Sequence, residues 1–164
     1  MKGCLAWVAA LSAATLLFSQ SQQAPLAKVY VGSDGLAHIV DAAGKDTAFP
    51  KEQGQVAVDS PQLSSDRQSA GWLLEEDNCC TSYPIPTGVF IYSHGKKWRL
   101  GTGQMIYDWC FLDGGKELAL SAGPVHNPEG QDLRRFDSSS GKLLQSWSGD
   151  LDAERPGWAA CLKQ

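Results

Sequence analysis

Four cysteines in the body of this 164-residue chain offer its clearest chemistry. An even number of cysteines in an exported protein favours a disulfide framework, and four cysteines allow three pairings. A bond between adjacent cysteines is one of them, but neighbouring Cα atoms lie only ~3.8 Å apart, closer than disulfides normally prefer. The sequence therefore favours a split arrangement, in which each adjacent cysteine bonds to a distant one. In any arrangement the last cysteine is expected to hold the C-terminal tail. The four residues are Cys79, Cys80, Cys110 and Cys161.

A metal site is the alternative use of such residues. Zinc sites normally show a Cys-x-x-Cys spacing, which this sequence lacks. His126-Asn127-Pro128-Glu129 places an imidazole and a carboxylate in one loop, but a metal there would need further ligands such as His94 or Asp132. A solvated turn explains that loop better, and His38 is interpreted as a packed or edge residue of a strand. No metal and no cofactor is predicted.

Two patterns raise the question of hydrolysis. Ala119-Leu120-Ser121-Ala122-Gly123 resembles a nucleophile elbow, which requires a following helix and, later in the chain, an acid and then a histidine. No helical pattern follows, and the last histidine, His126, precedes every remaining aspartate. No catalytic residue is therefore predicted. An extracellular hydrolase acting on a polymer stays open as an alternative, and it would need a cleft with paired acids. Its candidate acids are Asp108, Glu117 and Asp132.

One loop has the composition of a binding surface. Tyr83-Pro84-Ile85-Pro86 is stiffened by its prolines and stands beside the adjacent cysteines, and a stiff aromatic loop loses little entropy on binding. A connector fixed by proline and disulfide is the simpler interpretation of the same residues. If the loops do bind, we predict contact through residues 79–86 and 123–131. The candidate binding residues are Tyr83, Pro84, Pro86 and His126.

The N-terminus predicts export. Met1-Lys2-Gly3 is positively charged, residues 4–18 are almost all apolar, and the small residues Ser19 and Ser21 follow. This order is typical of a secretory signal peptide, and the apolar run is shorter than the ~20 residues of a membrane span. An uncleaved anchor is the alternative. We predict a secreted or periplasmic protein.

The charge balance disfavours nucleic acid as a partner. The whole chain has a formal net charge of −4, and removal of a signal peptide containing Lys2 would make it more negative. Binding to nucleic acid requires clustered Lys and Arg to neutralise phosphates, and Lys96-Lys97-Trp98-Arg99 is explained as a solvated strand end. A protein or a glycan, contacted through exposed loops, is the expected partner. No membrane contact is expected after cleavage.

The elements that would position these loops recur along the chain. Gly54-Gln55-Val56-Ala57-Val58-Asp59 matches Gly103-Gln104-Met105-Ile106-Tyr107-Asp108, since each consists of Gly-Gln, three apolar residues and Asp. A Gly-Lys turn between two β-forming segments occurs with its glycine at positions 44, 95 and 141. Glycine adopts the positive φ of such a turn without a Cβ clash. The spacing predicts a leading half unit at 28–50 and full units at 54–100 and 103–149.

Segments of these units resemble the blades of TolB-type, WD-repeat-like β-propellers. Blades of that family carry an aromatic residue or proline, then Phe or Leu, then Ser-x-Asp-Gly. Arg67 replaces the glycine of that pattern in one unit, and Leu112 replaces the serine in the other. The resemblance implies a blade fold that usually serves as a recognition scaffold and in some members caps an enzyme. It rests on Pro61-x-Leu63-Ser64-Ser65-Asp66-Arg67-Gln68 and Trp109-x-Phe111-Leu112-Asp113-Gly114-Gly115-Lys116.

The predicted fold class is all-β, with antiparallel blade-like β-meanders in about two and a half propeller-type repeats. Trp72 and Trp109 occupy inner positions of the repeat and are assigned to the core. A closed propeller needs at least four blades, so we expect an open or compacted arrangement with a covered edge. The oligomeric state stays undetermined.

The predicted organisation is a signal peptide at 1–21, a linker at 22–27, the repeat domain at 28–150 and a tail at 151–164. From these features we predict an exported, non-enzymatic binding or scaffold protein of unspecified ligand. The hydrolase is one alternative, and a structural protein without a ligand is the other.

Overall fold

The computed structural model describes residues 24–126 and 130–163, which form three antiparallel sheets. Helical structure within these ranges is confined to the 3-10 turns Asp113–Gly115 and Gly157–Ala159. The first sheet contains β1 (Leu26–Val31), β2 (Ala37–Asp41) and β3 (Asp46–Phe49). The second contains β4 (Gln55–Leu63), β5 (Ser69–Glu76), β6 (Ile85–Ser93) and β7 (Lys96–Gly101). The third contains β8 (Met105–Leu112), β9 (Glu117–Gly123), β10 (Gly130–Asp137) and β11 (Leu143–Asp150).

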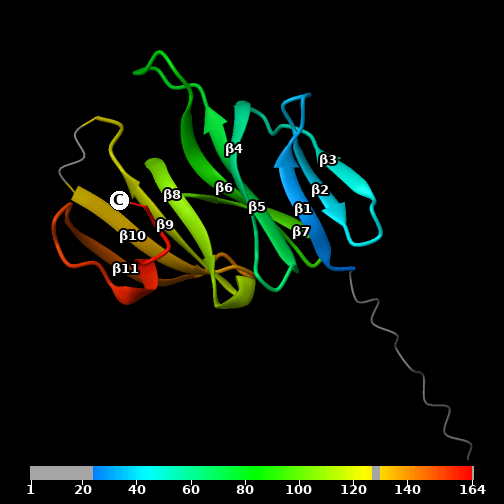
Figure 1. Ribbon diagram of the computed structural model, residues 1–164. Coiled ribbons are helices and arrows are strands. Elements are labelled where there is room, and N and C mark those ends of the chain that lie inside the picture. The colour runs from blue at the N-terminus through cyan, green and yellow to red at the C-terminus, as the bar shows by residue number, and fades with distance from the viewer. Residues whose placement is uncertain (1–23, 127–129, 164) are drawn as a thin grey trace, which may run out of the picture.

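Each sheet is a meander in which every strand pairs with its neighbours in sequence. The three sheets stand side by side like blades, and none of them closes into a barrel (Figure 1). The prediction of an open all-β fold is therefore confirmed. The predicted signal peptide, residues 1–21, and the first two linker residues lie outside the described residues. No helix in the described part of the chain is long and apolar enough to cross a membrane.

The repeated Gly-Lys turns occupy equivalent places in the sheets. Each joins the last two strands of its sheet, and Gly44, Gly95 and Gly141 have φ values of 83°, 74° and 68°. These values lie in the left-handed region that a Cβ disfavours, which explains why glycine recurs there. The two predicted full units coincide with the second and third sheets. The leading unit is larger than the predicted half, because it contains three strands.

The apolar core fills the two spaces between neighbouring sheets. Trp109 is only 1% exposed, and its Nε1 donates a hydrogen bond to the carbonyl oxygen of Ser60 at 3.2 Å. Trp72 stacks on Phe90 with ring centroids 4.6 Å apart. The assignment of both tryptophans to the core is confirmed. The buried side chains between the second and third sheets include Leu73, Val89, Ile91, Ile106, Leu118 and Leu120.

The two segments that carry the family resemblance form touching loops. Ser64 Oγ accepts the backbone N–H of Ser69 and donates to Asp66, which closes the β4–β5 loop. The N–H of Asp66 donates to the carbonyl oxygen of Gly114 in the β8–β9 loop at 3.1 Å. A Cβ on Gly115 would lie 2.6 Å from that of Ser64, so only glycine allows this approach. These loops hold the second and third sheets together at the end where the Gly-Lys turns lie.

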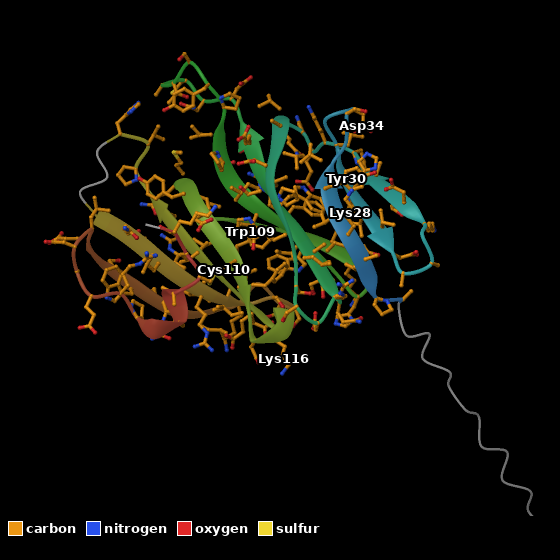
Figure 2. The ribbon with its side chains drawn as sticks, in the orientation of Figure 1. Lys28, Tyr30, Asp34, Trp109, Cys110 and Lys116 are labelled. Carbon is orange, nitrogen blue, oxygen red and sulfur yellow. A yellow bond between two sulfur atoms is a disulfide. The ribbon has the colours of Figure 1, made fainter. Side chains whose placement is uncertain are left out.

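The outer face of the first sheet is polar. His38 on β2 lies between two carboxylates, with Nδ1 3.0 Å from Asp46 and Nε2 3.1 Å from Asp34. The Tyr30 hydroxyl donates to the other oxygen of Asp46 at 2.5 Å, and Lys28 lies 4.2 Å from the centroid of the Tyr30 ring. Figure 2 labels Lys28, Tyr30 and Asp34 at this outer sheet. A polar outer face is what the terminal repeat of a stack requires, and no further sheet among residues 24–126 and 130–163 covers this one.

The C-terminal tail covers the outer face of the third sheet. Cys110 on β8 is bonded to Cys161, and Ala159 and Leu162 pack against the same face. Cys110 and Trp109 project to opposite faces of β8 (Figure 2), because successive side chains of a strand alternate. The expectation that Cys161 holds the tail is confirmed. The expected split pairing is wrong, because Cys79 and Cys80 lie on a distant loop and remain next to each other.

Candidate functional site

The predicted binding loops meet at one end of the sheets. The β5–β6 loop, residues 77–84, and the segment that follows β9 both lie at the end opposite the Gly-Lys turns (Figure 1). Nε2 of His126 lies 3.4 Å from the carbonyl oxygen of Cys80, to which it donates. A hydrogen bond therefore joins two loops from neighbouring sheets. Residues 127–129, part of the second predicted contact loop, lie outside the described residues.

The structure separates the predicted contact residues into loop and strand positions. Tyr83 is 55% exposed in the β5–β6 loop, shortly before β6 begins, and Pro84 is half-buried beside it. His126 is exposed. Pro86 is not a loop residue as predicted, because it belongs to β6 and pairs with Glu75. The register shifts at that pair, and an irregular point near the start of a strand tolerates a proline without an N–H.

An open groove of about 530 Å³ lies beside the two loops, between the ends of the second and third sheets. Its walls come from the start of β6, the end of β7, the connection into β8 and the end of β9. Apolar and polar side chains both line it, which is the usual character of a recognition surface. The lining side chains include Glu76, Ile85, Thr87, Arg99, Met105 and Val125.

A bidentate ion pair fixes one wall of this groove. Arg99 Nη1 lies 2.9 Å from Glu76 Oε1, and Arg99 Nη2 lies 3.0 Å from Oε2. The hydroxyl of Thr87 donates to the same carboxylate. The hydrogen bond from Arg99, and then that from Thr87, lowers the pKa of Glu76. The carboxylate therefore stays ionised and held, which suits it to positioning a ligand rather than to exchanging protons.

A second open cavity of about 540 Å³ continues from the groove across the end of the third sheet. The two cavities share Gln104, Gly123 and Pro124 in their walls. Asp132 lies 3.4 Å from Arg134 and accepts a hydrogen bond of 2.6 Å from the Ser148 hydroxyl. Asp150 also lines the second cavity, so the charged side chains in the walls of the two cavities are three acids and Arg99, and Arg134 pairs with Asp132 from outside the walls.

The adjacent cysteines lie on the β5–β6 loop, where Cys80 contacts His126 next to Val125 of the groove wall. Their Sγ atoms are 2.7 Å apart, and both residues are exposed. The hydrogen bond that the Cys80 thiol makes to Cys79, and then the negative charge of Cys79 as a thiolate, raise the pKa of the Cys80 thiol. Thiols that are close and exposed can undergo thiol–disulfide exchange.

The three acids of the hydrolase alternative are not brought together. Asp108 faces the tail and accepts the backbone N–H of Lys163 at 2.6 Å. Glu117 lies at the other end of β9, 2.5 Å from Arg135. Asp132 lines the second cavity and pairs with Arg134. Because a paired-acid mechanism needs two carboxylates facing one cleft, these residues do not provide its geometry.

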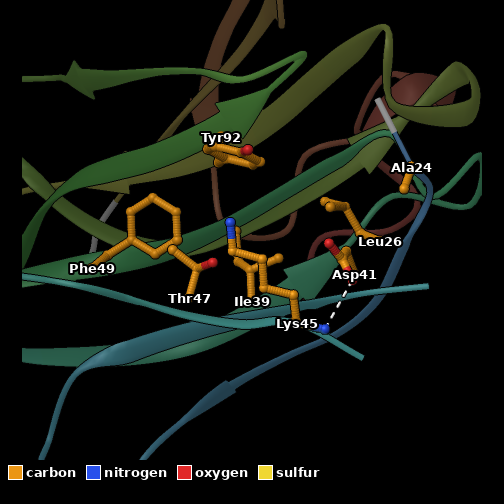
Figure 3. A pocket seen from close by; sticks show the side chains of 8 residues that line it. All are labelled: Ala24, Leu26, Ile39, Asp41, Lys45, Thr47, Phe49 and Tyr92. Carbon is orange, nitrogen blue, oxygen red and sulfur yellow. Dashed lines mark hydrogen bonds between the residues drawn. The ribbon is translucent and has the colours of Figure 1, made fainter. Parts of the chain in front are cut away.

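The remaining cavities and polar clusters give weaker support for a functional site. A cavity of about 120 Å³ lies between the first sheet and Tyr92, and Figure 3 shows the side chains around it. Asp41 is engaged there by the turn, since its Oδ1 accepts the N–H of Lys45 at 2.9 Å. No group of three or more His, Cys, Asp or Glu side chains suited to a metal ion occurs among residues 24–126 and 130–163.

Sequence reasoning missed Glu76 and Arg99, the best-ordered pair of the groove. From the sequence, Arg99 is explained as part of a solvated strand end and Glu76 is not singled out. The repeat contained a usable signal, because a meander places the end of β5, the start of β6 and the end of β7 side by side. Applied to the unit predicted at residues 54–100, this strand order predicts that Glu76, Thr87 and Arg99 lie side by side.

Comparison with known proteins gives only a distant likeness. No family model and no curated protein matches the chain. Among solved structures, the chain is similar to a puromycin-hydrolysing peptidase of Mycobacterium tuberculosis, with 17% identity and a TM-score of 0.45. The match covers 73% of this chain and 21% of that one. At this level the likeness carries no conclusion about activity.

Proposed function

We propose that this protein is an exported, non-enzymatic binding module that holds a segment of a protein partner in the groove between the second and third sheets. The observation that supports this most is the junction of two loops from different sheets, His126 to Cys80, beside an open groove. Sheets that fix recognition loops at one end are a common way to build a binding surface.

A protein partner is preferred to a glycan because of the groove's side chains. Ile85, Met105 and Val125 offer apolar contacts, and the Glu76–Arg99 pair offers hydrogen-bond partners fixed in place. Aromatic residues and Met are enriched at protein interfaces, and the exposed Tyr83 on the adjoining β5–β6 loop offers an aromatic anchor. The charges of the groove are paired, so a strongly charged ligand would find no unpaired opposite charge there among the residues described.

A site-specific crosslinker tests the proposal. A photoreactive phenylalanine analogue in place of Tyr83 should join the partner covalently, and mass spectrometry would identify it. Binding of the identified partner to purified protein should then weaken about tenfold or more in Tyr83→Ala, as for an aromatic anchor residue. Leu143→Ala is the matched control, because Leu143 is 48% exposed and lies at the opposite end of the sheets.

The results separate the alternatives. Equal binding by wild type, Tyr83→Ala and His126→Ala would refute the groove as the contact surface. Binding of a purified oligosaccharide that depends on Tyr83 would replace the protein partner by a glycan. Export is tested separately by determining the N-terminus of the mature protein. It is expected near residue 22, and recovery of Met1 on the exported or membrane-bound protein would contradict cleavage.

A further inference from the structure

The adjacent cysteines are placed to react with each other. Their Sγ atoms lie 2.7 Å apart, against about 2.05 Å in a covalent disulfide. Both are exposed at the tip of the β5–β6 loop. Among the described residues the other two cysteines, Cys110 and Cys161, are bonded to each other. Because neither of them is available, Cys79 and Cys80 can form an intramolecular disulfide only with each other among the described residues.

We propose that Cys79 and Cys80 form a reversible disulfide and make the β5–β6 loop a thiol–disulfide redox site. Adjacent residues joined by a trans peptide have Cα atoms ~3.8 Å apart, below the 4.4–6.8 Å that disulfides usually span. A bond between them closes a small, strained ring. Strained and exposed disulfides have more oxidising potentials and are the labile, regulatory ones. The Cys110–Cys161 bond joins residues far apart in sequence and is not subject to this constraint.

The reaction requires an external small-molecule disulfide such as oxidised glutathione. The thiolate of one cysteine attacks a sulfur of that disulfide, forms a mixed disulfide and releases one small thiol. The second cysteine, as thiolate, then attacks the protein sulfur of the mixed disulfide, forms the Cys79–Cys80 bond and releases the second small thiol. Two protein thiols are oxidised, one external disulfide is reduced, and the two protons of the cysteines end on the two released thiols.

The redox state reaches the groove through the peptide groups of Cys80. Its N–H donates to Asn78 Oδ1 at 2.9 Å, and its carbonyl oxygen accepts from His126 Nε2 at 3.4 Å. The amide of Asn78 also donates to the Tyr83 carbonyl oxygen at 3.5 Å. Ring closure constrains the peptide that joins Cys79 to Cys80, so it changes the contact between the two loops. This step rests on the proposed function: oxidation adjusts how tightly the groove holds its partner.

A redox titration with peptide mapping tests the chemistry without any partner. The full protein is equilibrated in buffers of graded reduced-to-oxidised glutathione ratio, alkylated and digested with trypsin. Cleavage at lysine and arginine places both cysteines in peptide 68–96, apart from Cys110 in 100–116 and Cys161 in 143–163. Peptide 68–96 should take up two alkyl groups in reducing buffer and none in oxidising buffer, where it should lose two hydrogens. The other two peptides should remain joined throughout.

Single variants distinguish the exchange from simple oxidation. Cys79→Ser and Cys80→Ser should each accumulate a glutathione adduct that the missing thiol cannot resolve, whereas wild type should not. The redox site is refuted if peptide 68–96 takes up two alkyl groups at every ratio, or if it is crosslinked to either of the other peptides. In either case Cys79 and Cys80 do not form a reversible bond with each other.

The link to binding is measured last and independently. Partner affinity should differ at least threefold between the reduced and oxidised proteins, and Cys79→Ser/Cys80→Ser should remove that difference. Equal affinity in both states would refute the link while the titration still decides the redox site. If Tyr83→Ala bound the partner as tightly as wild type, the binding proposal would be refuted and the redox chemistry would be unaffected.

Discussion

Replacing Cys110 and Cys161 together by alanine should destabilise the protein strongly, because it removes the disulfide that holds the tail on the third sheet. The bond closes a loop with a sequence separation of 51. In the chain-entropy model, constraining a loop of that length in the unfolded state contributes about 4 kcal/mol at 25 °C. Leu162 and Ala159 can still pack on the sheet without the bond, so we assign the loss mainly to the unfolded chain. For a domain of this size the melting temperature should fall by roughly 10–15 °C.

Urea unfolding followed by tryptophan fluorescence measures this effect, because Trp72 and Trp109 are buried in the folded protein and become exposed to solvent on unfolding. Cys79→Ser/Cys80→Ser is the matched control. It removes two exposed thiols and should change the free energy of unfolding by less than about 0.5 kcal/mol. The denaturant slope of the Cys110→Ala/Cys161→Ala variant should rise, since an uncrosslinked chain exposes more surface. A loss below about 1 kcal/mol would refute the reasoning and show that the tail detaches before the sheets unfold.

Three further predictions concern the turns and the charge clusters. Gly44→Ala, at φ 83° in open space, should lower the free energy of unfolding by about 1–2 kcal/mol. Gly115→Ala, at φ 116° with a Cβ 2.6 Å from that of Ser64, should lower it further. Thermal unfolding of the two variants checks this order. Hydrogen bonds to two aspartates raise the pKa of His38 in the folded protein. Its contribution to the free energy of unfolding should therefore be complete below pH ~6.5 and be lost as pH rises through the pKa of the folded protein. In urea unfolding at a series of pH values, His38→Gln should lack this loss. Hydrogen bonds from neighbouring serines lower the pKa of Asp137 to about 2. Its contribution to the free energy of unfolding should therefore be complete above pH ~4 and decrease as pH falls towards 2. In Asp137→Asn, the free energy of unfolding should change less with pH over this range.

The repeat could be predicted from the sequence because it depends on local chemistry. Gly44, Gly95 and Gly141 each need a positive φ, and a residue without Cβ at a regular spacing reports that need directly. The strand pattern between the turns then follows from neighbouring apolar runs. Trp72 and Trp109 could be assigned to the core for the same reason, since their place in the unit fixes the face on which they lie.

Features that depend on contacts between units could not be predicted in the same way. The pairing of Cys110 with Cys161 depends on where the tail crosses the third sheet, and composition contains no information on that path. The Glu76–Arg99 pair requires the register of three strands. His38 between its two aspartates requires β1, β2 and β3 to be aligned, and a single histidine in a strand pattern indicates none of this.

Among the described residues, the outer faces of the first and third sheets avoid exposing apolar side chains by different means. At the first sheet, polar side chains around His38 face the solvent where a further blade would lie. At the third, a tail bonded through Cys161 covers the apolar face. Stability of the stack is thus provided at the faces and at the turn end, where the β4–β5 and β8–β9 loops join. The β5–β6 loop is not needed for either task, so its cysteine pair, Tyr83 and Pro84 require another explanation, and the partner contact that we propose would provide one.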